Sequence, residues 1–215
     1  MSHLAGGAVT GGLRRLASRP AEPRTSRCEL CGEVLPAAHR HLLELTAGEL
    51  RCACRACQIL LDHAAAGGGH YRLVPERRRR LSGGFLDGPG WARVGAPVRT
   101  TFLIRDSRAG QVVRFYPSPA GAVREPADQA AWDLLRREQP ELSEMLPDVE
   151  ALLADRERGA WIVPVDDCYR LVGTIRTHWR GLTGGADVRE HVTRFFDDLN
   201  GRSIAPAADS DRSPS

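Results

Sequence analysis

The chain has 215 residues, of which 42% are hydrophobic and 27% are charged, and its formal net charge is +3. This composition is typical of a soluble globular protein, and no apolar run is long enough to cross a membrane. All 30 basic residues are arginine, which excludes mechanisms that need a lysine amine, such as Schiff-base catalysis.

The positive charge is concentrated in two segments. Residues 1–27 carry five arginines and one acidic residue, and residues 77–99 carry six arginines and one acidic residue. We expect a flexible arm over residues 1–26, an Arg- and Gly-rich linker over 76–92, and a flexible tail over 201–215. Because the other segments are slightly acidic, the sequence argues against a dedicated nucleic-acid surface.

The N-terminal segment does not resemble an export signal. Arg14 and Arg15 are followed by a short polar stretch that ends at Pro20, where a signal peptide would have an apolar core. We therefore expect a cytoplasmic protein that does not insert into membranes. Thiols stay reduced in that compartment, which argues against a disulfide framework.

Five of the six cysteines fall within residues 28–57 and include two CxxC pairs that are separated by 22 residues. A CxxC turn directs two thiolates to one point, and two such turns complete a tetrahedral metal site. The predicted ligands are Cys28, Cys31, Cys54 and Cys57. Zinc is the favoured metal, but iron accepts the same four thiolates, and four cysteines can also hold an iron–sulfur cluster.

The segment around these ligands predicts a small metal-binding module over residues 27–75. A cysteine knuckle comes first, a hairpin with a turn at 46–49 follows, and the second CxxC pair opens a helix. This order is typical of treble-clef and zinc-ribbon-like modules. We expect this four-cysteine module to precede a small α+β domain over residues 93–200.

Three further side chains of the module could bind a metal but are not among the predicted ligands. Cys52 is interpreted as a small strand residue, with a swapped ligand or a redox-sensitive neighbour as the alternatives. His39 and His41 would share one face of a strand. Because four thiolates already saturate a structural zinc, we interpret both histidines as exposed or packed on the hairpin.

In the second domain, two β-rich runs at 98–105 and 111–116 predict a hairpin, and Pro117 and Pro119 are expected to end its second strand. Residues 161–165 predict a buried strand.

Helices are predicted on both sides of that strand. Pro126 and Pro147 each mark the start of one helix, because proline is favoured in the first helical turn. Asp166 is expected to cap a third helix, and Asp187 with Glu190 resembles the capping box of a fourth.

Other candidate sites have plainer interpretations. Cys168 lies on an apolar helix stripe and is interpreted as a buried, inert thiol, with a low-pKa thiol as the alternative. Residues 181–185 resemble an anion-binding nest but fit a helix C-cap followed by a turn. The arginines of the third helix are interpreted as a solvated face, and the four at 77–80 as a flexible basic linker.

Seven strings taken together resemble an uncharacterised bacterial family, a domain of unknown function that is often encoded beside NiFe hydrogenase genes. The strings are CELCG at 28–32, HRHLL at 39–43, CACRAC at 52–57, YRLVP at 71–75, FYPSPAG at 115–121, CYRLVG at 168–173 and HWRGL at 178–182. The resemblance spans residues 28–199 and includes Cys52, whereas residues 77–92 match least well.

The resemblance implies a non-enzymatic, metal-binding accessory protein in the assembly, protection or support of a NiFe hydrogenase. Its implied partners are hydrogenase subunits or maturation proteins. The alternatives are a rubredoxin-like iron electron carrier and a zinc-finger regulator that binds nucleic acid. No set of nucleophile, base and orienting residue emerges from the sequence, so we do not expect an enzyme.

Overall fold

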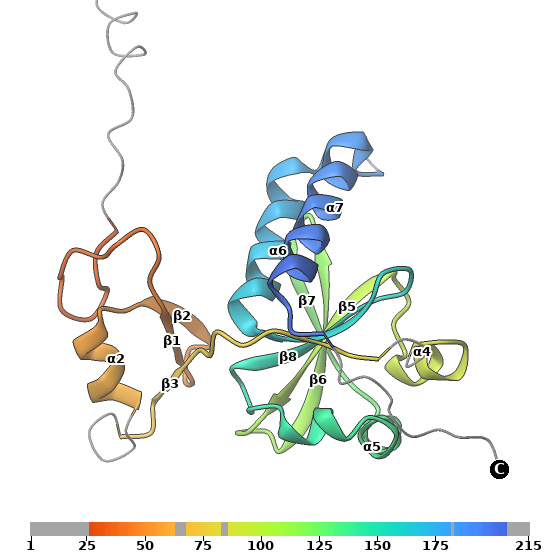
Figure 1. The fold of residues 1–215 in the computed structure, drawn as a ribbon, viewed down its shortest axis with the longest axis horizontal. Coiled ribbons are helices and arrows are strands. Elements are labelled where there is room, and N and C mark those ends of the chain that lie inside the picture. The colour runs from red at the N-terminus through yellow and green to blue at the C-terminus, as the bar shows by residue number, and fades with distance from the viewer. Residues whose placement is uncertain (1–25, 63–67, 83–85, 182, 206–215) are drawn as a thin grey trace, which may run out of the picture.

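The computed structural model describes residues 26–62, 68–82, 86–181 and 183–205. Figure 1 shows a small module on one side and a larger α+β domain on the other, joined by the segment that follows β3. The predicted α+β class, with the cysteine module ahead of the sheet domain, is confirmed. Among the described helices, none is long and apolar enough to cross a bilayer.

The small module has the predicted order of knuckle, hairpin and helix. Its elements are β1 (His41–Glu44), β2 (Glu49–Cys52), α2 (Arg55–Asp62) and β3 (Tyr71–Leu73). The strands form an antiparallel sheet with β1 in the centre. Neighbouring side chains of a strand face opposite sides, and both Leu42 and Leu43 of β1 are buried, so this sheet is covered on its two faces.

The larger domain is built on an antiparallel sheet in the order β4-β9-β8-β5-β6-β7. Its strands are β4 (Arg79–Arg80), β5 (Thr100–Asp106), β6 (Gln111–Ser118), β7 (Gly121–Pro126), β8 (Glu150–Asp155) and β9 (Gly159–Pro164). The predicted β5–β6 hairpin and the predicted strand at β9 are both confirmed.

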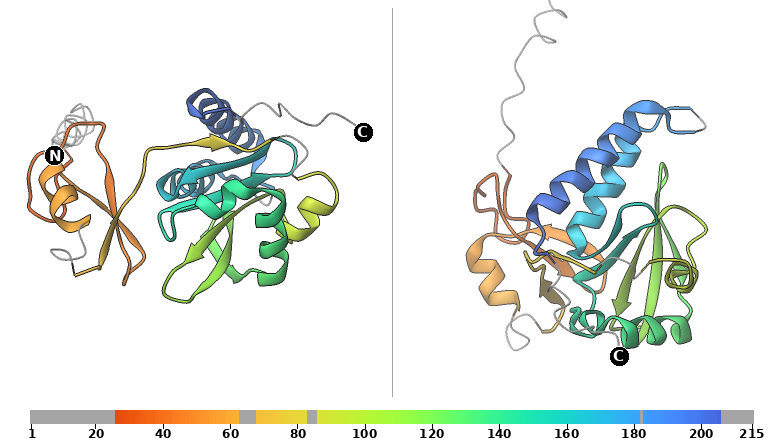
Figure 2. Two further views of the ribbon diagram at one scale, coloured as in Figure 1. Left: turned by 60° about the horizontal axis from the view of Figure 1, so that its bottom comes forward. Right: turned by 45° about the vertical axis from the view of Figure 1, so that its right-hand side comes forward.

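Helices cover both faces of this sheet. They are α4 (Pro89–Val94), α5 (Gln129–Glu138), the 3-10 helix η1 (Pro140–Glu144), α6 (Val165–His178) and α7 (Gly185–Arg202). The long helices α6 and α7 lie side by side on one face (Figure 2). Phe102 and Ile104 of β5 join the core under α6 and α7, whereas Leu103 joins the core under α4 and α5.

The segment after Pro147, predicted as a helix, is strand β8 instead. All six residues of β8 are buried, because α6 and α7 cover one face and α5 covers the other. A strand that is buried on both faces has no alternation of polar and apolar residues, so its pattern resembles that of a buried helix.

The end of β6 also differs from the prediction. Pro117 lies within β6, and the chain turns back as β7, which the sequence did not predict. Pro126 is the last residue of β7 and does not open a helix. The start of α5 is instead capped by the carboxylate of Asp128, which accepts hydrogen bonds from the backbone N–H groups of Ala130 and Ala131 (2.9 and 3.2 Å).

The expected caps of the last two helices are wrong, although α6 does end before the predicted break, at His178, and α7 begins at Gly185. Pro164 precedes α6, and Asp166 makes no capping hydrogen bond. Gly184 precedes α7 with a φ of 85°, so no capping box forms there. Asp187 instead contacts His178 of α6, with 3.0 Å between the carboxylate and Nδ1.

The arginine run at 77–80 was expected to be flexible, and this expectation is wrong. Arg79 and Arg80 form the edge strand β4, which pairs with β9. Ile204, within the expected tail, lies beside Arg79: its N–H donates to the carbonyl of Arg78, and its carbonyl accepts from the N–H of Arg80 (both 2.9 Å). Residues 1–25 of the expected arm, residues 83–85 of the expected linker and residues 206–215 lie outside the described residues.

Candidate metal centre

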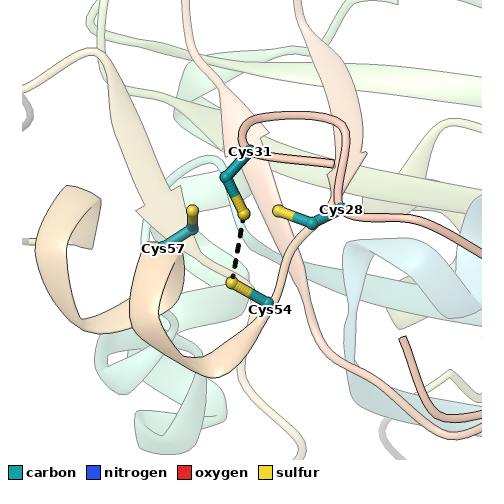
Figure 3. A group of neighbouring side chains, drawn as sticks. All are labelled: Cys28, Cys31, Cys54 and Cys57. Carbon is teal, nitrogen blue, oxygen red and sulfur yellow. Dashed lines mark hydrogen bonds between the residues drawn. The ribbon is translucent and has the colours of Figure 1, made fainter. Parts of the chain in front are cut away.

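The structure brings together the four thiols that the sequence predicted as ligands. Figure 3 shows one pair on the knuckle and the other at the start of α2, with all four pointing into one space. The sulfur atoms of Cys28, Cys31, Cys54 and Cys57 lie within 4.8 Å of one another. Cys31 Sγ and Cys54 Sγ are 3.6 Å apart. A tetrahedral zinc with bonds of about 2.3 Å separates its sulfurs by about 3.8 Å, whereas a disulfide needs about 2.05 Å, so the spacing fits a metal.

The knuckle is closed by backbone hydrogen bonds. The N–H of Gly32 donates to the carbonyl of Cys28 (2.8 Å), and the N–H of Cys28 donates to the carbonyl of Glu33 (2.7 Å). Gly32 has a φ of 80°, although an added Cβ would meet nothing within 4 Å. Its left-handed backbone, and not lack of space, therefore explains the glycine.

Backbone N–H groups also favour the thiolate form of Cys28. Burial opposes the ionisation of Cys28, but N–H groups of Cys54, Leu30 and Cys31 donate toward its sulfur, and they bring the pKa of this thiol down to about 6. Burial and the neighbouring thiols raise the pKa of Cys57. Four thiolates repel one another, so the group ionises fully only around a cation.

The module is anchored on the larger domain by polar contacts and by a shared apolar cluster. Arg72 of β3 donates to the carbonyl of Pro147 (3.1 Å) and pairs with the carboxylate of Asp148 (2.8 Å). Leu43 and Val74 are buried in the same apolar cluster as β5, β8, α6 and α7. The cysteine module and the α+β domain therefore share a core.

Sequence reasoning did not anticipate a second donor group beside the centre. The structure places the imidazoles of His39 and His41 and the thiol of Cys52 within 4.8 Å of one another, all half-buried. His41 and Cys52 are opposite each other in the register of β1 and β2. The alternation of His39 and His41 was a signal for one shared face, but only the strand register shows that Cys52 faces them.

A third donor group lies where α6 ends and α7 begins. The imidazole rings of His178 and His191 stack at 3.4 Å between centroids, and Nδ1 of each lies 3.0 to 3.2 Å from the carboxylate of Asp187. The hydrogen bond from His178 is the main cause that holds the pKa of Asp187 below its usual value. This group ties the two helices together.

Cys168 is fully buried, as predicted, and burial with the charges of Asp167 and Asp166 raises its pKa well above the ordinary value. A buried, protonated thiol is a poor nucleophile and a poor ligand. Arg170 of the same helix is exposed, as interpreted, and it also pairs with Asp167 (3.2 Å) and Asp198 (3.3 Å).

A family model described as a family of unknown function, DUF5947, matches residues 27–203. This range includes the cysteine module and nearly all of the described part of the larger domain. Neither the curated proteins nor the solved structures contain a match to the chain.

Proposed function

Because the chain belongs to this family of unknown function, we propose a function from its own geometry: a metal-binding accessory protein whose tetrathiolate centre holds zinc. The observation that carries the proposal is the convergence of four thiols from two CxxC pairs within 4.8 Å. Four thiolates in a tetrahedron form a closed site, which is the form that structural zinc takes.

A structural role for the metal fits the small size of the module. Three short strands and one helix of eight residues bury little apolar surface, and Ile59 and Leu60 of α2 are each 57% exposed. Zinc bound to such modules supplies on the order of 10 kcal/mol of folding free energy. The metal would thus stabilise the folded module. The surface of the folded module would then be available to a partner beside the larger domain.

The test compares two cysteine variants of the full chain. Cys54→Ser should lose the metal of the centre and make residues 41–62 sensitive to protease, while strands β5–β9 stay resistant. Cys168→Ala, which removes a thiol outside the centre, should keep the full metal content. Elemental analysis and mass spectrometry of the proteolytic fragments measure both effects. Equal metal content in the two variants contradicts the ligand assignment.

The partner part of the proposal comes from the family resemblance. We expect the protein to serve the assembly, protection or support of a NiFe hydrogenase, without enzymatic activity of its own. Affinity purification of the tagged chain from its own host should recover hydrogenase subunits or maturation proteins, and Cys54→Ser should recover fewer. Recovery of nucleic acid or unrelated proteins alone would overturn this part.

A rubredoxin-like iron electron carrier is the second candidate, because Cys31 is exposed and would bring a ligand of the metal to the surface. Protein from its own host should then contain iron and show a reversible one-electron reduction. The alternative of a nucleic-acid regulator rests on the cysteine module and on the arginines at 77–80, and three of these arginines pair with carboxylates of the larger domain. These pairs are Arg77–Glu150, Arg78–Asp167 and Arg79–Glu144.

A further inference from the structure

The donor group beside the centre is formed by three side chains that the hairpin register brings together. His41 of β1 is paired with Cys52 of β2, and His39 lies two residues before His41, just ahead of the strand. Their donor atoms lie within 4.8 Å of one another. The group shares no residue with the tetrathiolate centre.

In both imidazoles, Nδ1 makes a hydrogen bond, which leaves Nε2 as the possible metal ligand. Nδ1 of His39 lies 2.9 Å from the carbonyl oxygen of Pro36, and Nδ1 of His41 lies 3.2 Å from a carboxylate oxygen of Asp166. Oxygens of these kinds accept hydrogen bonds, so each Nδ1 carries the hydrogen. Nε2 of each neutral ring therefore keeps a free lone pair.

This pattern is the one that metal-binding histidines show. Such a histidine usually donates its other ring N–H to a carboxylate or a backbone carbonyl, which fixes the ring and its tautomer. Here His39 has a backbone carbonyl and His41 has a carboxylate. The backbone of Cys52 is held in place as well, because its N–H donates to the carboxylate of Glu29 (2.5 Å).

One of the free lone pairs is shut off from solvent. Nε2 of His39 is buried and has no hydrogen-bond partner among the described residues. A buried acceptor that is left unpaired destabilises the fold, because it has lost its hydrogen bonds to water without gaining others. A cation bound to Nε2 would satisfy this atom.

We propose that His39, His41 and Cys52 form a second metal site, distinct from the tetrathiolate centre. Two imidazoles and a thiolate favour Zn²⁺ or a similar divalent transition metal over Mg²⁺ or Ca²⁺. Donors of a tetrahedral zinc lie about 3.5 Å apart, so side-chain shifts on the order of 1 Å would complete the site.

The second site differs from the first in having an open position. A closed structural site uses four protein ligands, and three ligands leave one position for water or for a donor group of another molecule. The metal at this site is therefore exchangeable, whereas the metal of the tetrathiolate centre is held by four thiolates. This site extends the proposed function and is tested whether or not the first centre holds zinc.

The larger domain takes part in the second site through Asp166, which lies in the first turn of α6 and orients His41. Loss of such a partner usually weakens metal affinity by about 10- to 100-fold. Asp166→Asn should therefore weaken the second site by that factor and leave the metal of the first centre in place. Asp166 is a positioning residue, so its variant should still bind two metals at saturating concentration.

The experiment loads metal-depleted full-length protein with Co²⁺ or Zn²⁺ and counts the bound ions. Wild type should hold two ions per chain, and His39→Gln and Cys52→Ser should each hold one. His191→Gln removes a histidine from the donor group between α6 and α7 and should hold two. A single ion in wild type that His39→Gln and Cys52→Ser both retain, or two ions in both of these variants, overturns the proposal.

X-ray absorption at the zinc edge of the wild type tests the same site without a variant, so a variant that fails to fold does not block the test. The second site should add the scattering of imidazole ligands, because the tetrathiolate centre supplies only sulfur. One zinc with sulfur ligands alone overturns the second site but supports the first. One zinc with imidazole ligands overturns the assignment of the first centre.

Discussion

Glu150 of β8 is a carboxylate with no exposure to solvent. Arg77 donates to its two oxygens from Nε and Nη2 (2.5 and 2.8 Å), and the N–H of Leu146 donates a further hydrogen bond (2.7 Å). Removal of one partner of a buried ion pair leaves an uncompensated charge, which costs about 3–5 kcal/mol. We expect Arg77→Ala to lower the free energy of unfolding by this amount in urea titrations followed by circular dichroism.

Arg124→Ala is the matched control for that experiment. Arg124 also pairs with a carboxylate, that of Asp106 (3.0 Å), but its side chain is 57% exposed. Exposed ion pairs contribute about 0–1 kcal/mol. Similar losses in the two variants would mean that the pair at Glu150 does not stabilise the fold through its burial.

At the scale of single residues, the sequence predicted contacts between residues that lie close together in the chain. The two CxxC pairs identify their four cysteines because each pair is local and its turn geometry is known. The pairing of Arg77 with Glu150 joins residues 73 positions apart and has no local signal. The approach of Cys52 to His41 depends on the strand register, which composition does not determine.

Gly184 determines how α6 connects to α7. Its φ is 85°, and an added Cβ would lie 2.8 Å from Val188 Cγ1 and 3.1 Å from the ring of Trp179. We expect Gly184→Ala to lower the free energy of unfolding by about 2 kcal/mol or more, from the left-handed backbone and the overlap together.

Gly201, near the end of α7, provides the comparison because an added Cβ there meets nothing within 4 Å. Alanine is favoured over glycine in helices, so Gly201→Ala should stabilise the protein by up to about 1 kcal/mol. Thermal and urea denaturation of both variants measure these changes. A Gly184→Ala variant as stable as Gly201→Ala would contradict the steric argument.

The connection between α6 and α7 should also respond to pH through Asp187. Its pKa is lowered in the folded protein, first by the hydrogen bond from His178. The carboxylate therefore contributes stability that is complete above the unfolded pKa of about 3.9 and is lost as the pH falls through the lower folded pKa. We expect Asp187→Asn to have a lower Tm than wild type near pH 6, with the difference shrinking below pH ~4.

Asp197→Asn controls for the loss of a charge on α7, since Asp197 is exposed on the same helix. Thermal scans from about pH 2.5 to 7 should show no comparable loss of Tm in this variant. A Tm difference for Asp187→Asn that is constant over this range would rule out the carboxylate as its source.

Burial on both faces does not by itself decide whether an element is predicted, because β5 and β9 are covered on both faces and were predicted as strands. The β5–β6 hairpin is framed by a polar turn at residues 107–110, and its prediction is confirmed. Strand β8 has helices on both faces and was mistaken for a helix. Strand β4 consists of two arginines, so its place in the sheet follows from ion pairs and pairing with β9.

At the scale of the whole molecule, the cysteine module and the α+β domain are joined through β1. Leu43 is 6% exposed and belongs to the core cluster of the larger domain, whereas its neighbour Leu42 is fully buried and lies outside that cluster. Adjacent strand residues face opposite sides, so Leu43 faces the larger domain and Leu42 faces the rest of the module. Substitution of Leu43 therefore tests the contact between the module and the larger domain, and substitution of Leu42 tests the packing within the module.

This arrangement predicts different effects for two alanine variants of similar chemistry. Each should lose about 2–5 kcal/mol of local stability through a cavity. Leu43→Ala should increase amide hydrogen exchange in β1 and also in α6, because its cavity opens the junction with the larger domain. Leu42→Ala should increase exchange in β1 and β3 but leave α6 protected. Hydrogen-exchange mass spectrometry measures both patterns, and identical protection of α6 in the two variants would show that Leu43 does not join the module to the domain.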